Sequence, residues 1–93
     1  MDSPSHDIRR ESGRYVIGFD AGAEAELVFH RSGARMIITH TEVPPELAGR
    51  GIAAVLVKAA VADARAEGLK IVPRCSYVAA QFRRHPEWSD LLG

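Results

Sequence analysis

Two short segments carry the residues that are most suited to chemistry. The first is Gly49-Arg50-Gly51, which leads into an alanine-rich stretch with the pattern of a helix. Glycines at the start of a helix leave backbone N–H groups uncovered, and the positive end of the helix dipole favours an anion there. The segment therefore predicts a site for a phosphate or pyrophosphate group.

This glycine segment differs from two common nucleotide-binding motifs. A P-loop ends in Gly-Lys-Ser/Thr, whereas the nearest lysine, Lys58, lies two turns into the predicted helix. A dinucleotide fingerprint would need a third glycine at the position of Ala54. What remains is a Gly-x-Ala pattern formed by Gly51 and Ala53.

The second segment contains Cys75, the single cysteine of the 93 residues. Cys75 stands between a predicted strand and a helix that Ser76 is expected to cap. A thiol at a helix N-terminus is expected to have a lowered pKa, and the thiolate is the nucleophilic form. A lone cysteine can equally be a small buried hydrophobe at a strand end, so both interpretations stay open.

Glu42 is the acidic candidate. It lies at the end of a long predicted strand, where a carboxylate can take a proton from an incoming ammonium group or can simply be a solvated acid. His40 shares a strand face with Glu42, so the two side chains can pair. The spacing of His30, His40 and His85 is not that of metal ligands, and no metal is expected.

Composition narrows the classes of function. The chain has 12 basic and 12 acidic residues, which argues against a nucleic-acid-binding protein that neutralises phosphates. No apolar run approaches the roughly 18 residues of a membrane span, and no signal peptide opens the chain. Because a single cysteine cannot form an internal disulfide, a cytoplasmic protein is expected. Residues 1–6 are expected to be a flexible tail, and residues 7–93 a single domain.

Hydrophobic patterning predicts four antiparallel strands, then a helix, a parallel strand and a second helix. The predicted strands are 7–11, 14–19, 24–31, 34–43 and 69–73, and the predicted helices are 49–67 and 77–84. A two-residue hairpin turn is expected at 12–13. This ββββαβα order is an α+β fold, with one layer of helices on a mixed sheet. The C-terminal segment is expected to dock Trp88 and Leu91 or Leu92 on this body.

Three segments, in this order and spacing, resemble a known family. They are Thr41-Glu42-Val43-Pro44, then Gly49-Arg50-Gly51-Ile52-Ala53, then Cys75-Ser76-Tyr77-Val78 with Arg84-His85-Pro86-Glu87-Trp88. With them, the chain resembles the GCN5-related N-acetyltransferases, specifically a minimal class with a cysteine in its last strand. The resemblance covers nearly everything from residue 8 to 92. It implies acetyl-CoA as cosubstrate and an amine acceptor, either a small molecule or a protein, and the chain is expected to be a monomer or weak dimer.

The resemblance also implies roles for particular residues. The strands that end at Val43 and Arg74 would splay apart, and the thioester of acetyl-CoA would lie in the gap between them. There Cys75 would accept the acetyl group, or the group would pass directly to the amine, with Glu42 as the base in either case. The backbone N–H of Val43 would hold the thioester carbonyl. The cofactor-binding residues are then Val43, Gly49, Arg50, Gly51, Ile52 and Ala53.

The chain departs from the family pattern in two places. Ala48 stands where the family has Gln or Arg beside the pyrophosphate, and a tight turn at 12–13 replaces the helices that build an acceptor groove in larger members. These departures keep a second function open, that of an acyl-CoA-binding module with little turnover that recruits a protein partner. Tyr77 either packs or protonates the departing CoA, although the family's tyrosine aligns nearer to Phe82.

Overall fold

A computed structural model describes residues 8–93 of the chain, so the flexible tail expected at residues 1–6 lies outside the described part. The strands are β1 (Ile8–Glu11), β2 (Arg14–Gly18), β3 (Glu24–Ser32), β4 (Arg35–Glu42) and β5 (Lys70–Pro73). The helices are α1 (Ile52–Glu67) and α2 (Ser76–Arg84), with 3-10 turns η1 (Asp20–Gly22), η2 (Pro45–Leu47) and η3 (Pro86–Leu91). The predicted order ββββαβα is therefore confirmed.

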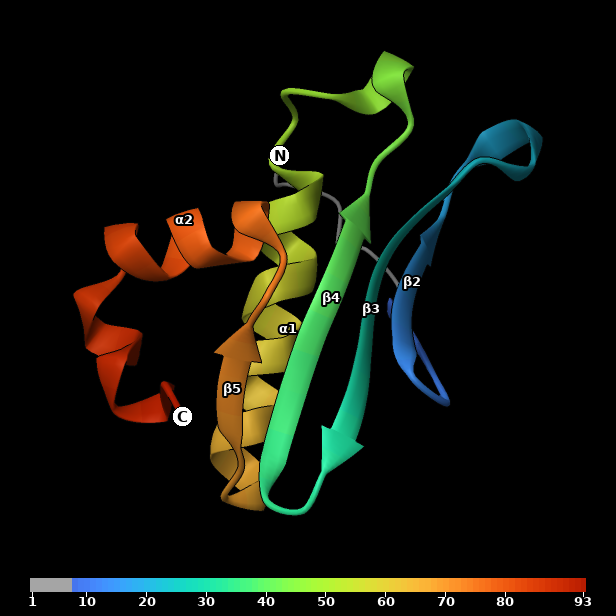
Figure 1. The fold of residues 1–93 in the computed structure, drawn as a ribbon. Coiled ribbons are helices and arrows are strands. Elements are labelled where there is room, and N and C mark those ends of the chain that lie inside the picture. The colour runs from blue at the N-terminus through green and yellow to red at the C-terminus, as the bar shows by residue number, and fades with distance from the viewer. Residues whose placement is uncertain (1–7) are drawn as a thin grey trace.

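The five strands form one sheet in the order β1-β2-β3-β4-β5. The first four pair antiparallel with their neighbours in the chain, and β5 pairs parallel with β4 (Figure 1). Ser12 and Gly13 form the expected two-residue turn between β1 and β2, where Gly13 has a φ of 82° that suits glycine. The α+β class and the mixed sheet are as predicted.

Helix α1 lies against one face of the sheet (Figure 1). Its buried residues include Ile52, Leu56, Ala60 and Ala64, which are spaced by four and so line one side of the helix. The helix was expected to begin near Gly49, but it begins at Ile52 because the preceding glycines have positive φ angles that an α-helix cannot contain. It ends at Gly68, whose left-handed conformation closes the last turn, as expected.

Helix α2 and the C-terminal segment complete the hydrophobic core beside β5 (Figure 1). Phe82 of α2 meets Trp88 edge-on, with ring centroids 5.3 Å apart. Leu91 is buried as well, whereas Leu92 is 46% exposed and forms a bridge to Ile71 of β5. The expected docking of Trp88 is confirmed, and Leu91 is the leucine that docks with it.

A β-bulge in β4 changes which side chains face α1. The pairing of β3 with β4 shifts register between Val28 and Phe29, so that Thr39 is an extra residue in β4. Ile38, before the bulge, is fully buried in the core, and Thr41, after it, faces the same side of the sheet. In a regular strand, residues three apart would face opposite sides. The bulge therefore decides which residues at the end of β4 can meet α1.

An ion-pair network joins the first strands to α1. Asp63 of α1 accepts hydrogen bonds from Arg10 Nε and Nη2 at 2.8 and 3.2 Å, and from the Tyr15 hydroxyl at 2.9 Å. The pKa of Asp63 is lowered. The hydrogen bond from Arg10 has the largest effect on this pKa, and the hydrogen bond from Tyr15 acts in the same direction. The three residues come from β1, β2 and α1. The network therefore attaches the helix to the β1–β2 edge of the sheet, the edge opposite β5.

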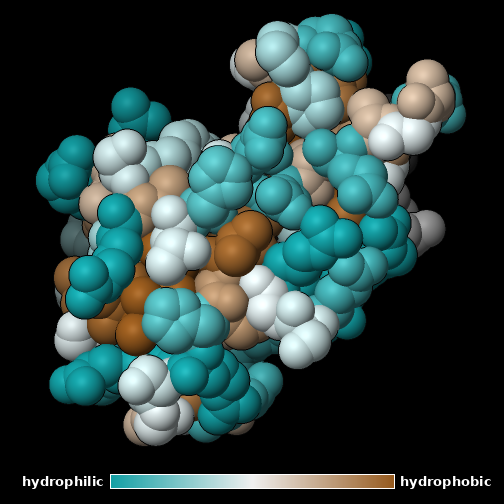
Figure 2. Space-filling view, turned by 45° about the vertical axis from the view of Figure 1, so that its right-hand side comes forward, coloured by the Kyte–Doolittle hydropathy of each residue, from teal (hydrophilic) through white to brown (hydrophobic). Residues whose placement is uncertain are grey.

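The face of the sheet away from α1 is mostly polar. Figure 2 is turned by 45° from the view in which α1 lies behind the sheet, and it shows hydrophilic side chains around a small apolar patch. Two ion pairs lie on this face, Arg9 with Glu24 and Arg14 with Glu26. Neither helix of the described residues is long and apolar enough to cross a membrane.

Candidate functional site

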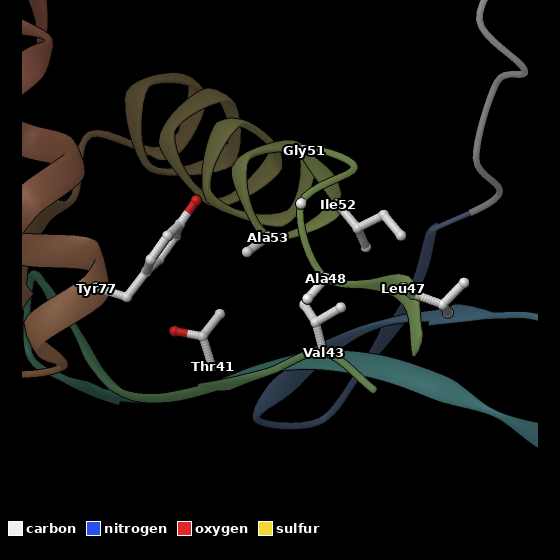
Figure 3. Close-up of a pocket in the computed structure, with 9 residues that line it drawn as sticks. Thr41, Val43, Leu47, Ala48, Gly51, Ile52, Ala53 and Tyr77 are labelled. Carbon is white, nitrogen blue, oxygen red and sulfur yellow. The ribbon is translucent and has the colours of Figure 1, made fainter. Parts of the chain in front are cut away.

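A pocket of about 390 Å³ lies between the end of β4, the loop that contains η2, and the start of α1 (Figure 3). One wall comes from β4 and the residue after it, another from the loop, and a third from the N-terminus of α1. Tyr77 of α2 closes the fourth side. The lining residues are Thr41, Val43, Leu47, Ala48, Gly49, Gly51, Ile52, Ala53 and Tyr77.

The start of α1 presents bare backbone to this pocket. Gly49 and Gly51 have φ angles of 83° and 75°, and a Cβ added at either position would meet no atom within 4 Å. No side chain caps the N-terminus of α1 within the described residues. The first N–H groups of a helix have no intrahelical partner, so the pocket combines open space, free donors and the positive end of a helix dipole. This arrangement can hold an anion.

Strands β4 and β5 separate before β4 ends. Their pairing stops at Ile38 and Pro73, whereas β4 continues to Glu42. The carbonyl of Ile38 accepts N–H groups from both Arg74 and Cys75, at 3.0 and 3.1 Å, and the chain then turns into α2. The end of β4 is thus paired on its β3 side only.

Cys75 lies at this separation and is partly buried. Its Sγ is 2.9 Å from the hydroxyl oxygen of Thr41, and Cys75 itself is the N-cap residue of α2, in place of the expected Ser76. Burial acts to raise the pKa of the thiol, but hydrogen bonds from the Thr41 hydroxyl and from the backbone of Val78, Tyr77 and Thr41 outweigh it, so the pKa is lowered. These hydrogen bonds favour the nucleophilic thiolate form of Cys75.

Glu42 is placed differently from the pocket residues. Because Thr41 faces the pocket, the next residue in the strand points to the opposite face of the sheet. There its carboxylate lies 3.4 Å from His40 Nε2, the pairing that the sequence had allowed. Glu26 of β3 joins them. Each of the three side chains has one nitrogen or oxygen atom that could bind a metal ion, and these atoms lie within 4.8 Å of one another. Spacing along the chain could not reveal this group, because Glu26 comes from the neighbouring strand.

The remaining candidates lie in three different surroundings: a smaller hollow, the core and the pocket. Arg50 does not line the main pocket but a smaller hollow of about 240 Å³ beside it, together with Glu46. Phe82 is buried in the core and so has no access to a ligand. Tyr77 is 37% exposed, and its ring extends from α2 toward the α1 side of the pocket (Figure 3). Tyr77 therefore faces a ligand site in addition to any packing role.

The sequence analysis assigned no site role to two pocket residues, Leu47 and Thr41. Leu47 is the last residue of the three-residue turn η2, which is too short to show a hydrophobic periodicity. The contact of Thr41 with Cys75 joins residues 34 positions apart, and a single sequence contains no signal for it.

The fold and the pocket together have the form of a GCN5-related N-acetyltransferase, with a glycine-lined helix N-terminus beside two parallel strands that separate. The model of the family described as GCN5-related N-acetyl-transferase matches residues 14–91 of the chain. The chain therefore belongs to this family of acetyltransferases.

A solved structure supports the same assignment. The chain is similar to the NMR solution structure of a GCN5-like protein from Staphylococcus aureus that is described as a candidate N-acetyltransferase. The two sequences are 30% identical, and the match has a TM-score of 0.78 and covers 94% of this chain and 87% of the other. The match extends over nearly the full length of both chains, so the minimal size is shared.

Proposed function

We propose that the protein transfers an acetyl group from acetyl-CoA to an amine, with residues 7–93 acting as a single domain in the cytoplasm. The pocket at the start of α1 is the observation that carries this proposal, because its bare N–H groups and open space at Gly49 and Gly51 suit a pyrophosphate. Val43, Ile52 and Ala53 supply the rest of the cofactor contact from β4 and α1.

Cys75 is the proposed carrier of the acetyl group. Its thiolate attacks the thioester carbon, the bond between Sγ and the acetyl carbon forms, and the bond to the CoA sulfur breaks. CoA leaves as a thiolate and takes a proton from water. The amine then attacks the acetyl-cysteine, loses one proton, and releases Cys75 as a thiolate. The lowered pKa of Cys75 supports this sequence of steps, because each cycle begins and ends with the charged sulfur.

Glu42 is the proposed acceptor of the amine's proton. Its side chain lies on the face of the sheet away from α1, so the amine would approach from that face while CoA occupies the other. The short turn at 12–13 leaves that face uncovered by any helix of the described residues. An open acceptor side suits a small amine or an exposed amine of a protein.

The alternative is an acyl-CoA-binding module with little turnover. The observation that favours it is the position of Glu42, which does not line the pocket. If Glu42 cannot reach the amine, acetyl-CoA would stay bound, or Cys75 would stay acetylated, without efficient transfer. Turnover with an amine distinguishes this alternative from the transferase.

Intact-mass spectrometry tests the proposal directly. Wild-type protein incubated with acetyl-CoA should gain the mass of one acetyl group at Cys75 and lose it when an amine is added. The matched control is Cys75→Ala, which removes the only thiol of the chain and should bind acetyl-CoA without forming the adduct. A wild-type protein that binds acetyl-CoA but neither gains an adduct nor acetylates any amine would support the binding module instead.

A further inference from the structure

We propose that Thr41 is a positioning residue that holds the Cys75 thiolate for acyl transfer, a role that rests on the proposed function. The Thr41 hydroxyl oxygen lies 2.9 Å from Cys75 Sγ. Thr41 also lines the pocket, whereas Cys75 is not among the lining residues. The Thr41 side chain therefore contacts the thiol and also faces the ligand site.

Two irregularities of the backbone create this contact. The bulge at Thr39 turns Thr41 toward the α1 side of the sheet. The carbonyl of Ile38 accepts N–H groups from both Arg74 and Cys75, which ends β5 and directs the chain into α2. Because Thr41 and Cys75 are 34 positions apart in the chain, both irregularities are needed to bring the two side chains together.

The protonation state of the sulfur fixes the direction of the hydrogen bond. A neutral thiol can donate to the Thr41 oxygen or accept from it, but a thiolate can only accept. Once Cys75 is ionised, the Thr41 hydroxyl must donate to Sγ, which both stabilises the negative charge and limits the movement of the sulfur. When Sγ bonds to the acetyl carbon, its charge is lost and this hydrogen bond weakens, so it favours the reactive form over the acetylated form.

The backbone N–H groups at the start of α2 also act on the sulfur, although Tyr77 lines the pocket with its side chain. Hydrogen bonds from the backbone of Val78 and Tyr77 contribute to the lowered pKa of Cys75. Replacing Thr41 leaves these donors in place. The variant therefore isolates the contribution of the hydroxyl from that of the helix.

The single cysteine makes alkylation a specific measure of this contact. Thr41→Val keeps the shape of the side chain but removes the O–H donor. We expect iodoacetamide to alkylate this variant roughly tenfold more slowly at neutral pH, with the pH profile of the rate moved upward, because a charge-assisted hydrogen bond is lost. Thr41→Ser keeps the hydroxyl and should stay close to the wild type in both rate and pH profile.

Ser32→Ala is the control. Ser32 is the last residue of β3, where it pairs with Arg35 at the end of the β3–β4 pair opposite to Thr41, and its side chain is exposed. This variant should leave the alkylation profile unchanged. If circular dichroism shows that Thr41→Val is unfolded, Thr41→Ala takes its place, since it also lacks the hydroxyl and adds no bulk.

The outcomes separate this proposal from the proposed function. Equal alkylation profiles in wild-type protein and a folded variant without the hydroxyl would overturn the role of Thr41. A slower profile in Thr41→Val that Thr41→Ser restores supports it. Absence of an acetyl adduct on the wild-type protein would instead overturn the role of Cys75 as carrier, whatever the alkylation profiles show.

Discussion

At the scale of single residues, Gly51 and Gly33 share a left-handed backbone but have different surroundings. Their φ angles are 75° and 61°, and a Cβ at either position would meet nothing within 4 Å. Gly51 lines the pocket at the start of α1, whereas Gly33 lies in the turn between β3 and β4. A side chain at either position strains the backbone by a similar amount, so the pair can separate backbone strain from loss of ligand space.

Gly51→Val is expected to weaken acetyl-CoA binding by about tenfold or more, because the side chain occupies the space that the pyrophosphate needs, and a tenfold change corresponds to about 1.4 kcal/mol. Calorimetric titration measures the affinity. Gly33→Val is the control and should lower the thermal stability to a similar degree while keeping the affinity of the wild type. Equal affinities in the two variants would show that the anion does not bind at the start of α1.

The residues of the candidate site differ in how far the sequence could place them. Gly49, Gly51 and Cys75 belong to local patterns at helix starts, which short stretches of sequence determine. Glu42 belongs to a strand, and its direction depends on whether the alternation of side chains is unbroken. The bulge at Thr39 breaks it. The residue types around Thr39 do not indicate a bulge. The sequence therefore could not predict which face of the sheet the Glu42 side chain occupies.

At the scale of elements, the order and type of the helices and strands followed from hydrophobic periodicity. Where an observed boundary differs from the predicted one, the difference is one to three residues. It is largest at α1, where two glycines with positive φ angles delay the start to Ile52. The separation of β4 from β5 has a different cause. It follows from the Ile38 carbonyl receiving two N–H groups, a backbone event that side-chain patterns do not record.

The network around Asp63 gives an element-scale prediction about pH. Because Arg10 and Tyr15 lower the pKa of Asp63 in the folded state below its ordinary value of 3.8, the network contributes stability that is present above this value. That stability is lost as the pH falls through the folded-state pKa, since a protonated Asp63 no longer pairs with Arg10. Asp63→Asn should therefore cost about 1–2 kcal/mol near neutral pH and lose much of this difference in strong acid.

Urea unfolding at several pH values measures this effect. Asp90→Asn is the matched control, because Asp90 pairs with Arg65 at 2.8 Å but is 61% exposed, and exposed ion pairs contribute little to stability. A constant difference between wild-type protein and Asp63→Asn at every pH would contradict the linkage, and would assign the effect to packing of the side chain instead of its charge.

At the scale of the whole molecule, the basic and acidic residues are equal in number but unevenly distributed along the chain. Residues 1–47 contain 5 basic and 8 acidic side chains, and residues 48–93 contain 7 basic and 4 acidic ones. Among the described residues, no acidic group lies within ion-pair distance of Arg50, Arg74, Arg83 or Arg84. Unpaired cations in the half that carries the glycine segment favour the approach of an anionic ligand, as the proposed cosubstrate requires.

Ligand binding should also stabilise the whole fold, because the pocket joins β4, the η2 loop, α1 and α2. A ligand at about 100 times its dissociation constant stabilises the native state by about 2.7 kcal/mol. In a domain of this size, about 1 kcal/mol raises the melting temperature by roughly 4–8 °C, so acetyl-CoA should raise it by roughly 10–20 °C. Differential scanning calorimetry measures this shift, which should shrink in Gly51→Val and persist in Gly33→Val. A saturating concentration that leaves the melting temperature of the wild-type protein unchanged would contradict binding at this pocket, since any ligand specific to the native state must raise it.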